Sequence, residues 1–284
     1  MTNRLGCSTI PFGAFDLEAA LQAIAKIGFP VVDIAFIEGV AEHYNPLDKS
    51  LADFQELGKL VRSHGLTVST LNVNAGSFND SVTADKHTAT VKSALDCASA
   101  LRCCGVTTKV GDSPSGDWEE SARLSVGRIR ELADHANTLK VKLGLEIPHT
   151  KTLTDDLDKS VRFFEMVDHI SVDVCFDSAH LYSCIGDFSE PTRLFVGKLG
   201  HCHLRDAKGD ETHLIPGDGE IDFDFCHSMM RLAGFHRDYT LEIKMPETAS
   251  LDEVKEALAR GRDTLLPFIR PVVERKKKEQ KEAG

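Results

Sequence analysis

The sequence predicts a single parallel α/β barrel, a (β/α)₈ TIM barrel, on three observations. The chain has 284 residues, and a barrel of this kind needs about 250. Short apolar runs rich in β-branched residues alternate with longer amphipathic stretches, which is the pattern of repeated strand–helix units. The first run is followed by PFGAFD and not by the glycine-rich phosphate turn of a doubly wound open sheet, the main alternative fold.

Eight strands are expected from the short apolar runs. The first helix illustrates the pattern that separates them, because Leu17, Leu21, Ile24 and Ile27 recur at helical spacing and Gly28 follows as a helix terminator. The expected strands are residues 5–10, 31–36, 64–73, 105–110, 141–147, 171–177, 198–206 and 238–243.

Six helices can be placed between and after these strands. They are expected at residues 15–28, 50–64, 82–103, 117–138, 153–166 and 251–268. We assign residues 1–270 to the barrel domain. The remaining segment, 271–284, is rich in lysine and glutamate and is expected to be a charged C-terminal tail.

Composition excludes several classes of function. The formal net charge is −11, which disfavours general binding to the phosphate backbone of nucleic acids. No apolar run approaches the roughly 18 residues that cross a bilayer, and the N-terminus lacks the apolar region of a signal peptide. The eight cysteines are widely spread without a CxxC pair. We therefore expect a cytoplasmic protein with reduced thiols and no membrane partner.

Polar residues stand where the last four expected strands end. The fifth strand ends in Glu146, the sixth in Asp177 and the eighth in Glu242. The seventh carries His201 and His203 at period two, so both side chains point to the same side. Active sites of parallel barrels lie at the carboxyl ends of the strands, so these residues are expected to converge.

Three carboxylates and an imidazole gathered at one place require a cation between them, since isolated buried ions are costly. A donor set of this composition favours Mn²⁺, with Mg²⁺, Co²⁺ and Zn²⁺ as alternatives. The sequence therefore predicts a divalent metal cofactor.

Five segments of the second half resemble the xylose isomerase-like superfamily of barrels, in particular the D-tagatose 3-epimerase-like members. The segments are LEIPHT, DSAH, HCHLRDAK, IPGDGEIDF and LEIK, which occur in the family's order. They span about 100 residues. The first half of the chain shows the same alternation of strands and helices but contributes no family motif.

This resemblance implies roles for individual residues. Its metal ligands would be Glu146, Asp177, His203 and Glu242, and Glu146 and Glu242 would exchange protons with the substrate. His180 would contact a sugar hydroxyl, and Arg205 would lie near the position of a substrate-binding cationic residue of the family. His201 is read from its position on the strand as a packed interior residue or a neighbour of a metal ligand and not as a ligand itself, while the role of His213 stays open.

Three further residues near strand ends, Lys109, Asn72 and Glu38, are candidates for substrate contacts. The loop ETHLIPGDGEI also resembles endonuclease IV, a multi-zinc nuclease. That family needs histidines from earlier strands, whereas here the second, third and fourth strands end in AFIEG, NVNAG and KVGD. The missing histidines and the acidic charge argue against a nuclease.

The expected function is that of a divalent-metal-dependent isomerase or epimerase. Its substrate would be a keto sugar or related polyol, and the reaction a proton transfer through a metal-bound enediolate. A lyase of the inosose-dehydratase or 3-keto-glycoside-cleaving kind shares that intermediate and remains the alternative. A catalytically inactive scaffold, or the barrel subunit of a hetero-oligomer, is a further alternative. The resemblance implies a homo-oligomer.

Overall fold

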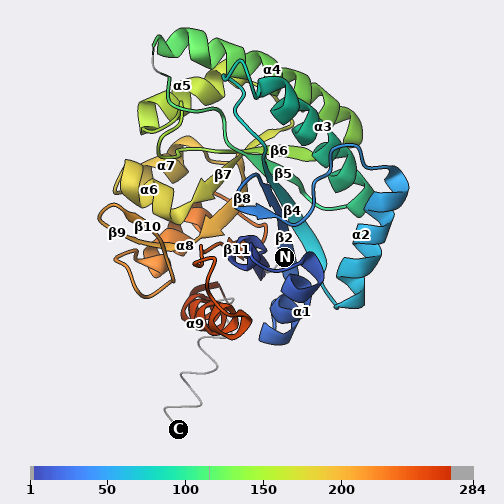
Figure 1. Cartoon of the computed structure of the whole chain (residues 1–284). Coiled ribbons are helices and arrows are strands. Elements are labelled where there is room, and N and C mark those ends of the chain that lie inside the picture. The colour runs from blue at the N-terminus through green and yellow to red at the C-terminus, as the bar shows by residue number, and fades with distance from the viewer. Residues whose placement is uncertain (1–2, 115, 270–284) are drawn as a thin grey trace.

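Eight parallel strands form a closed barrel in the computed structural model, which describes residues 3–114 and 116–269 (Figure 1). Strand β1 pairs with both β11 and β2, and this double pairing closes the sheet. The predicted TIM barrel is confirmed. In chain order the barrel strands are β1 (Leu5–Ser8), β2 (Val31–Ile37), β4 (Thr67–Asn74), β5 (Gly105–Thr108), β6 (Lys142–Glu146), β7 (Val172–Asp177), β8 (Leu199–Leu204) and β11 (Tyr239–Leu241).

Helices surround the barrel on its outside (Figure 1). In the described residues they are α1 (Leu17–Ile27), α2 (Leu51–Ser63), α3 (Ala84–Leu101), α4 (Trp118–Leu139), α5 (Leu157–Val167), α6 (Ser178–Cys184), α7 (Ser189–Leu194), α8 (Phe223–Leu232) and α9 (Leu251–Ile269), while a short 3₁₀ helix, η1 (Ile10–Phe12), links β1 to α1. A short strand β3 (Ala41–Glu42) pairs antiparallel with β2, and β9 (Asp206–Lys208) forms a hairpin with β10 (Glu211–Leu214).

Helix α1 shows how the sequence sets these boundaries. The Asp16 side chain accepts a hydrogen bond from the backbone N–H of Ala19 at 2.7 Å, which satisfies one of the unpaired donors of the first turn. Leu21 and Ile24 are fully buried one turn apart. Gly28 ends the helix at φ +100°, a left-handed conformation that glycine adopts without steric cost.

Several predicted boundaries were wrong, for identifiable reasons. The strand expected from residue 64 begins at Thr67, because Gly65 turns the chain at φ +75°. The helix expected from residue 153 begins at Leu157, since Asp156 caps it by accepting from the N–H of Lys159 at 2.7 Å. The strand expected to run to residue 206 ends at Leu204, and Asp206 starts the hairpin.

The loop after that hairpin is organised by Asp206, which is 1% exposed. Its carboxylate accepts hydrogen bonds from the backbone N–H groups of Gly217, Gly219 and Ile221 at 2.8, 3.0 and 3.1 Å. A Cβ at Gly219 would lie 2.3 Å from Asp206 Oδ1, so the close approach requires glycine.

The barrel interior is unusually polar. Buried polar side chains on the strands include Asp33 on β2, Thr70 and Asn72 on β4, and His201 and His203 on β8. Barrel interiors are more often filled by branched apolar residues, so this interior forms the floor of a polar site. Among the described helices, none is long and apolar enough to cross a membrane. The proposed tail at 271–284 lies outside the described residues.

Candidate active site

Four side chains predicted as metal ligands converge at the carboxyl end of the barrel. Glu146 ends β6, Asp177 ends β7, His203 lies on β8, and Glu242 directly follows β11. Each offers one donor atom, and these atoms all lie within 4.8 Å of one another. The parallel register explains the convergence, because Asp177 pairs directly with His203 and Thr240 pairs with His203 from the other side.

All four side chains are buried, with exposed fractions from 0 to 5%. The imidazole of His203 is the centre of the group. Its Nδ1 lies 3.4 Å from Oε1 of Glu146 and 3.5 Å from Oε2 of Glu242. Strands β7 and β8 separate β6 from β11 in the sheet, so the two glutamates flank the group from opposite sides.

The two glutamates differ in their electrostatic surroundings. Burial would raise the pKa of Glu146, but the neighbouring His149 and His203 outweigh it and hold that pKa well below its usual value. Burial raises the pKa of Glu242 to about 7, and the negative charges of Glu146 and Asp177 oppose the lowering effect of His203 and Arg205. Neighbouring carboxylates with pKa values pushed apart are typical of acid–base sites.

Asp177 is held in place by helix α6. Its Oδ1 accepts hydrogen bonds from the backbone N–H groups of Ala179 and His180 at 2.8 and 3.0 Å, which caps the helix. This leaves Oδ2 to face Nε of Arg205 at 2.8 Å. Arg205 also places Nη1 3.7 Å from Oε1 of Glu242, so one buried cation faces two carboxylates of the group.

Three histidines lie next to the charged groups of the site: His180 and His213 contact the guanidinium of Arg205, and His149 lies near the carboxylate of Glu146. Arg205 donates to Nε2 of His180 at 2.8 Å and to Nδ1 of His213 at 2.6 Å. Burial lowers the pKa of His180 to about 3 and that of His213 to about 4, the latter with help from the Arg205 charge. Both rings therefore accept hydrogen bonds as neutral imidazoles. His149 stacks on His180 with ring centroids 3.8 Å apart.

A cavity of about 480 Å³ opens above this group. Its volume suits a small organic molecule. The predicted substrate-contact residues His180, Arg205, Lys109 and Asn72 line the cavity, as do Glu146 and Glu242. Asn72 donates to Oε2 of Glu242 at 3.1 Å. Asp177 and His203 do not line the cavity and lie beneath it.

Glu38 differs from the other predicted contact residues. It does not line this cavity, and its carboxylate instead pairs with Lys86 on the surface. Both side chains of that pair are 47% exposed. The prediction that Glu38 contacts the substrate has no support in the geometry, because the residue lies beyond the end of β2 and points to solvent-accessible Lys86.

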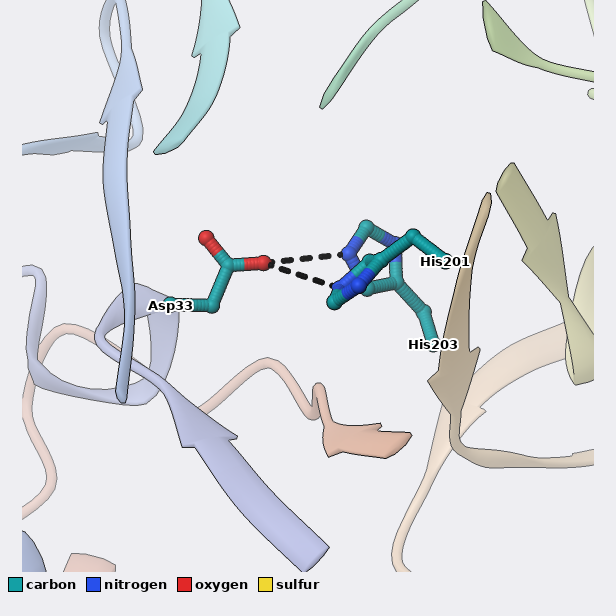
Figure 2. A group of neighbouring side chains, drawn as sticks. All are labelled: Asp33, His201 and His203. Atoms are coloured by element: carbon teal, nitrogen blue, oxygen red, sulfur yellow. Dashed lines mark hydrogen bonds and ion pairs between the residues drawn. The ribbon is translucent and has the colours of Figure 1, made fainter. Parts of the chain in front are cut away.

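Two residues of the site were missed from the sequence. Asp33 lies on β2 with no exposed surface, and Figure 2 shows its carboxylate facing the rings of His201 and His203. Oδ2 of Asp33 lies 3.4 Å from Nε2 of His201 and 3.3 Å from Nε2 of His203. Burial would raise the pKa of Asp33, but the hydrogen bonds from the two histidines lower it to about 2.

His149 is the second missed residue. Its Nε2 lies 3.7 Å from Oε2 of Glu146, and it follows that glutamate by three positions after a cis Ile147–Pro148 bond. The signal in the sequence was the histidine of LEIPHT, which lacked an assigned role. For Asp33 the signal was a lone carboxylate inside the apolar run VVDIAF, at a position where a strand of a parallel barrel is usually apolar.

A family model described as a xylose isomerase-like TIM barrel matches residues 21–264. The chain belongs to this family. Curated relatives of this chain share little sequence with it. An inosose isomerase of Halalkalibacterium halodurans is 23% identical over 158 residues, which cover 53% of this chain and 56% of that protein. The chain thus matches only about half of that relative's length.

Solved structures share the complete architecture of this xylose isomerase-like barrel. The D-psicose 3-epimerase of Clostridium cellulolyticum H10, solved with D-tagatose, has a TM-score of 0.78 at 17% identity and covers 94% of this chain and 100% of its own. A structure of the IolI protein with a bound zinc atom has a TM-score of 0.75 at 21% identity, with 93% and 99% covered. These likenesses establish the fold.

Proposed function

We propose that this protein is a divalent-metal-dependent isomerase or epimerase that acts on a keto sugar or a related cyclic polyol ketone. The observation that carries the proposal is the placement of Glu146 and Glu242. Both carboxylates line the central cavity, and both belong to the buried four-residue group with Asp177 and His203. An epimerase for D-psicose and inosose isomerases among the similar proteins support the substrate class.

The donor set fits a divalent cation. Three carboxylates and one imidazole lie within 4.8 Å of one another and are buried together, an arrangement whose negative charge Arg205 alone does not balance. Oxygen donors with a single imidazole suit Mn²⁺, Mg²⁺ or Co²⁺, and the zinc atom of the IolI structure keeps Zn²⁺ among the candidates. Glu146, Asp177, His203 and Glu242 would hold the ion.

A divalent ion at this place supplies positive charge that stabilises a substrate oxygen as it becomes negative. The protein's own residues perform the proton transfer. One glutamate takes the proton from the carbon beside the substrate carbonyl, and the C–H electron pair moves into the new C=C bond. The other glutamate returns a proton from the opposite face, which inverts that carbon. Return to the neighbouring carbon instead exchanges the carbonyl and hydroxyl positions.

Neighbouring side chains bind and orient the substrate in this proposal. His180, Arg205, Lys109 and Asn72 reach the cavity from four different strand ends and offer hydrogen bonds to hydroxyl groups. Asn72 also donates to Oε2 of Glu242, while Oε1 of that carboxylate lies 3.7 Å from Nη1 of Arg205, so both oxygens have a fixed neighbour. Such fixed donors hold the reacting carbon near both glutamates.

The test combines metal analysis with isotope exchange. Elemental analysis before and after chelation is expected to find one divalent ion per chain, and NMR in D₂O to find deuterium at a carbon next to the carbonyl. The panel contains D-psicose, D-tagatose, an inosose and a 3-keto glycoside. The product separates an epimerase from an isomerase, and loss of a β-substituent would identify a lyase. Absence of both metal and exchange would contradict the proposal.

A further inference from the structure

The two nitrogens of His203 face different partners. Nδ1 faces the carboxylates of Glu146 and Glu242 at 3.4 and 3.5 Å. Nε2 faces Oδ2 of Asp33 at 3.3 Å. A neutral imidazole carries a proton on one nitrogen and a lone pair on the other, so the partner of Nε2 decides which nitrogen can bind a cation among the carboxylates.

Asp33 is the partner of Nε2 and can therefore determine which nitrogen of His203 carries the proton. It comes from β2, on the far side of β1 and β11 from β8, and it reaches His203 through the barrel interior. It is completely buried, and its ion pairs within the described part of the chain go to His201 and His203. A buried carboxylate can only accept hydrogen bonds from these rings, because an ionised carboxylate has no proton to donate.

His201 limits the freedom of the Asp33 carboxylate. Its Nε2 lies 3.4 Å from the same Oδ2 and 3.3 Å from Oγ1 of Thr70, and its ring packs edge-on against His203 with centroids 4.9 Å apart. Figure 2 shows both rings approaching one oxygen of Asp33. His201, predicted to be a packed interior residue or a neighbour of a metal ligand, is therefore a neighbour that helps to hold Asp33 against His203.

We infer that Asp33 is a positioning residue that accepts the Nε2–H of His203 and so directs the lone pair of Nδ1 toward Glu146, Asp177 and Glu242. Carboxylates that accept from the distal N–H of a metal-binding histidine fix its tautomer and increase its basicity. This inference rests on the proposed function, because it assigns His203 as a ligand. It adds a residue from the opposite wall of the barrel that does not touch the cavity.

The principal test is metal binding by Asp33→Asn, which keeps the size of the side chain and removes its charge. Calorimetric titration with Zn²⁺ is expected to show a dissociation constant 10- to 100-fold higher than that of the wild type. The visible spectrum of the Co²⁺ form should change with it. The matched control is Thr107→Val, which removes a buried hydroxyl of β5 that has no partner among the described residues. Its affinity should equal that of the wild type.

A double-mutant cycle shows whether the effect runs through His203. In a His203→Ala background, Asp33→Asn is expected to cause no further loss of Zn²⁺ affinity, since the ring that it positions is gone. Equal losses in both backgrounds would overturn the inference. Two zinc ions per wild-type chain and one per Asp33→Asn chain would also overturn it, because Asp33 would then be a ligand itself.

A measurement on the wild type keeps the inference testable if Asp33→Asn does not fold. Proton–nitrogen NMR of the Zn²⁺-loaded protein is expected to find His203 protonated on Nε2, and protonation on Nδ1 would overturn the inference. A wild type that binds Zn²⁺ together with an Asp33→Asn variant of unchanged affinity would refute only this inference. A wild type that binds no divalent ion would refute the proposed function as well.

Discussion

Arg205 lies 2.8 Å from Asp177, Nε to Oδ2, and both side chains are buried. The arginine is a fixed internal cation for a group of carboxylates. Removing one partner of a buried ion pair leaves an uncompensated charge, which costs about 3–5 kcal/mol. The guanidinium therefore contributes to stability as well as to the proposed substrate contacts, and the two contributions can be separated.

Arg205→Met is expected to destabilise the chelated protein by about 3 kcal/mol, as measured by urea unfolding with EDTA. Added Mn²⁺ should recover more stability in this variant than in the wild type, because the ion replaces the missing positive charge. Arg193→Met is the control, since its pair with Glu190 is exposed and worth about 0–1 kcal/mol. Equal unfolding free energies for Arg205→Met and the wild type would refute this role.

Glu146→Gln and Glu242→Gln should each lower turnover of the best substrate by at least about 10²-fold, because general acid–base residues contribute about 10²–10⁴-fold. Circular dichroism should show an unchanged fold, since glutamine is isosteric. Glu247→Gln, on the rim of an adjoining cavity, is a suitable control and should retain the wild-type rate. Wild-type turnover in either of the two site variants would refute the acid–base assignment.

His203→Ala should lower the metal content of dialysed protein, and His201→Ala should lower it much less. The reason is that Nδ1 of His203 faces Glu146 and Glu242, while His201 faces Asp33 and Thr70. Elemental analysis after dialysis measures both variants under the same conditions. A fully metallated His203→Ala variant together with a metal-free His201→Ala variant would identify His201, and not His203, as the metal ligand.

The site residues from the second half of the chain could be predicted because they lie at the ends of strands. Glu146 and Asp177 are the last residues of β6 and β7, and Glu242 immediately follows β11. A carboxylate at such a position is visible in the sequence once the alternating pattern places the strands. Parallel register then brings these ends together without further information.

Asp33 could not be placed in this way, because it lies within β2 and contacts His203, 170 positions away along the chain. Such contacts depend on which strands face each other across the closed barrel. Helix α8 was missed for a local reason. Its buried residues Phe223, Cys226 and Met230 form a helical stripe, but the glycine-rich segment before it hid the position at which the helix begins. Asp222 caps it by accepting from the N–H of Phe225 at 3.0 Å.

Buried His87 should make the stability of the protein sensitive to acid. Burial, with the nearby Lys109 charge, lowers the pKa of His87 to about 3. Its Nδ1 accepts from the N–H of Ala75 at 3.2 Å, so the folded state holds the neutral ring. The unfolded chain has a histidine pKa of about 6.5. Full stability is therefore present above about pH 6.5 and is lost as the pH falls toward 3.

Between pH 7 and pH 5 this histidine should cost the wild type about 2 kcal/mol of unfolding free energy, at about 1.4 kcal/mol per pH unit below the unfolded pKa. His87→Asn removes the titration, and its side-chain oxygen can accept from Ala75 in place of Nδ1. Urea unfolding at both pH values should show a smaller decrease for the variant than for the wild type. Identical decreases would show that His87 does not govern this pH dependence.

Asp206→Ala should loosen the loop beside the cavity. The substitution leaves the N–H groups of Gly217, Gly219 and Ile221 without their common acceptor. Each buried donor left unsatisfied costs about 1–3 kcal/mol, and partial access of water to the loop reduces the total to about 2–4 kcal/mol. Hydrogen exchange at residues 217–221 should accelerate, while exchange in β6 and β7 should not.

Asp218→Ala provides the matched control in the same loop. Its carboxylate pairs with Arg260 on the surface, 2.7 Å from Oδ2 to Nη2, and both side chains are exposed. Because that pair is screened by solvent, its loss should cost less than about 1 kcal/mol and leave the backbone exchange rates unchanged. Equal hydrogen-exchange rates at residues 217–221 in Asp206→Ala and Asp218→Ala would contradict this prediction. The loop conformation would then depend on its glycines and on packing, and not on the buried Asp206 carboxylate.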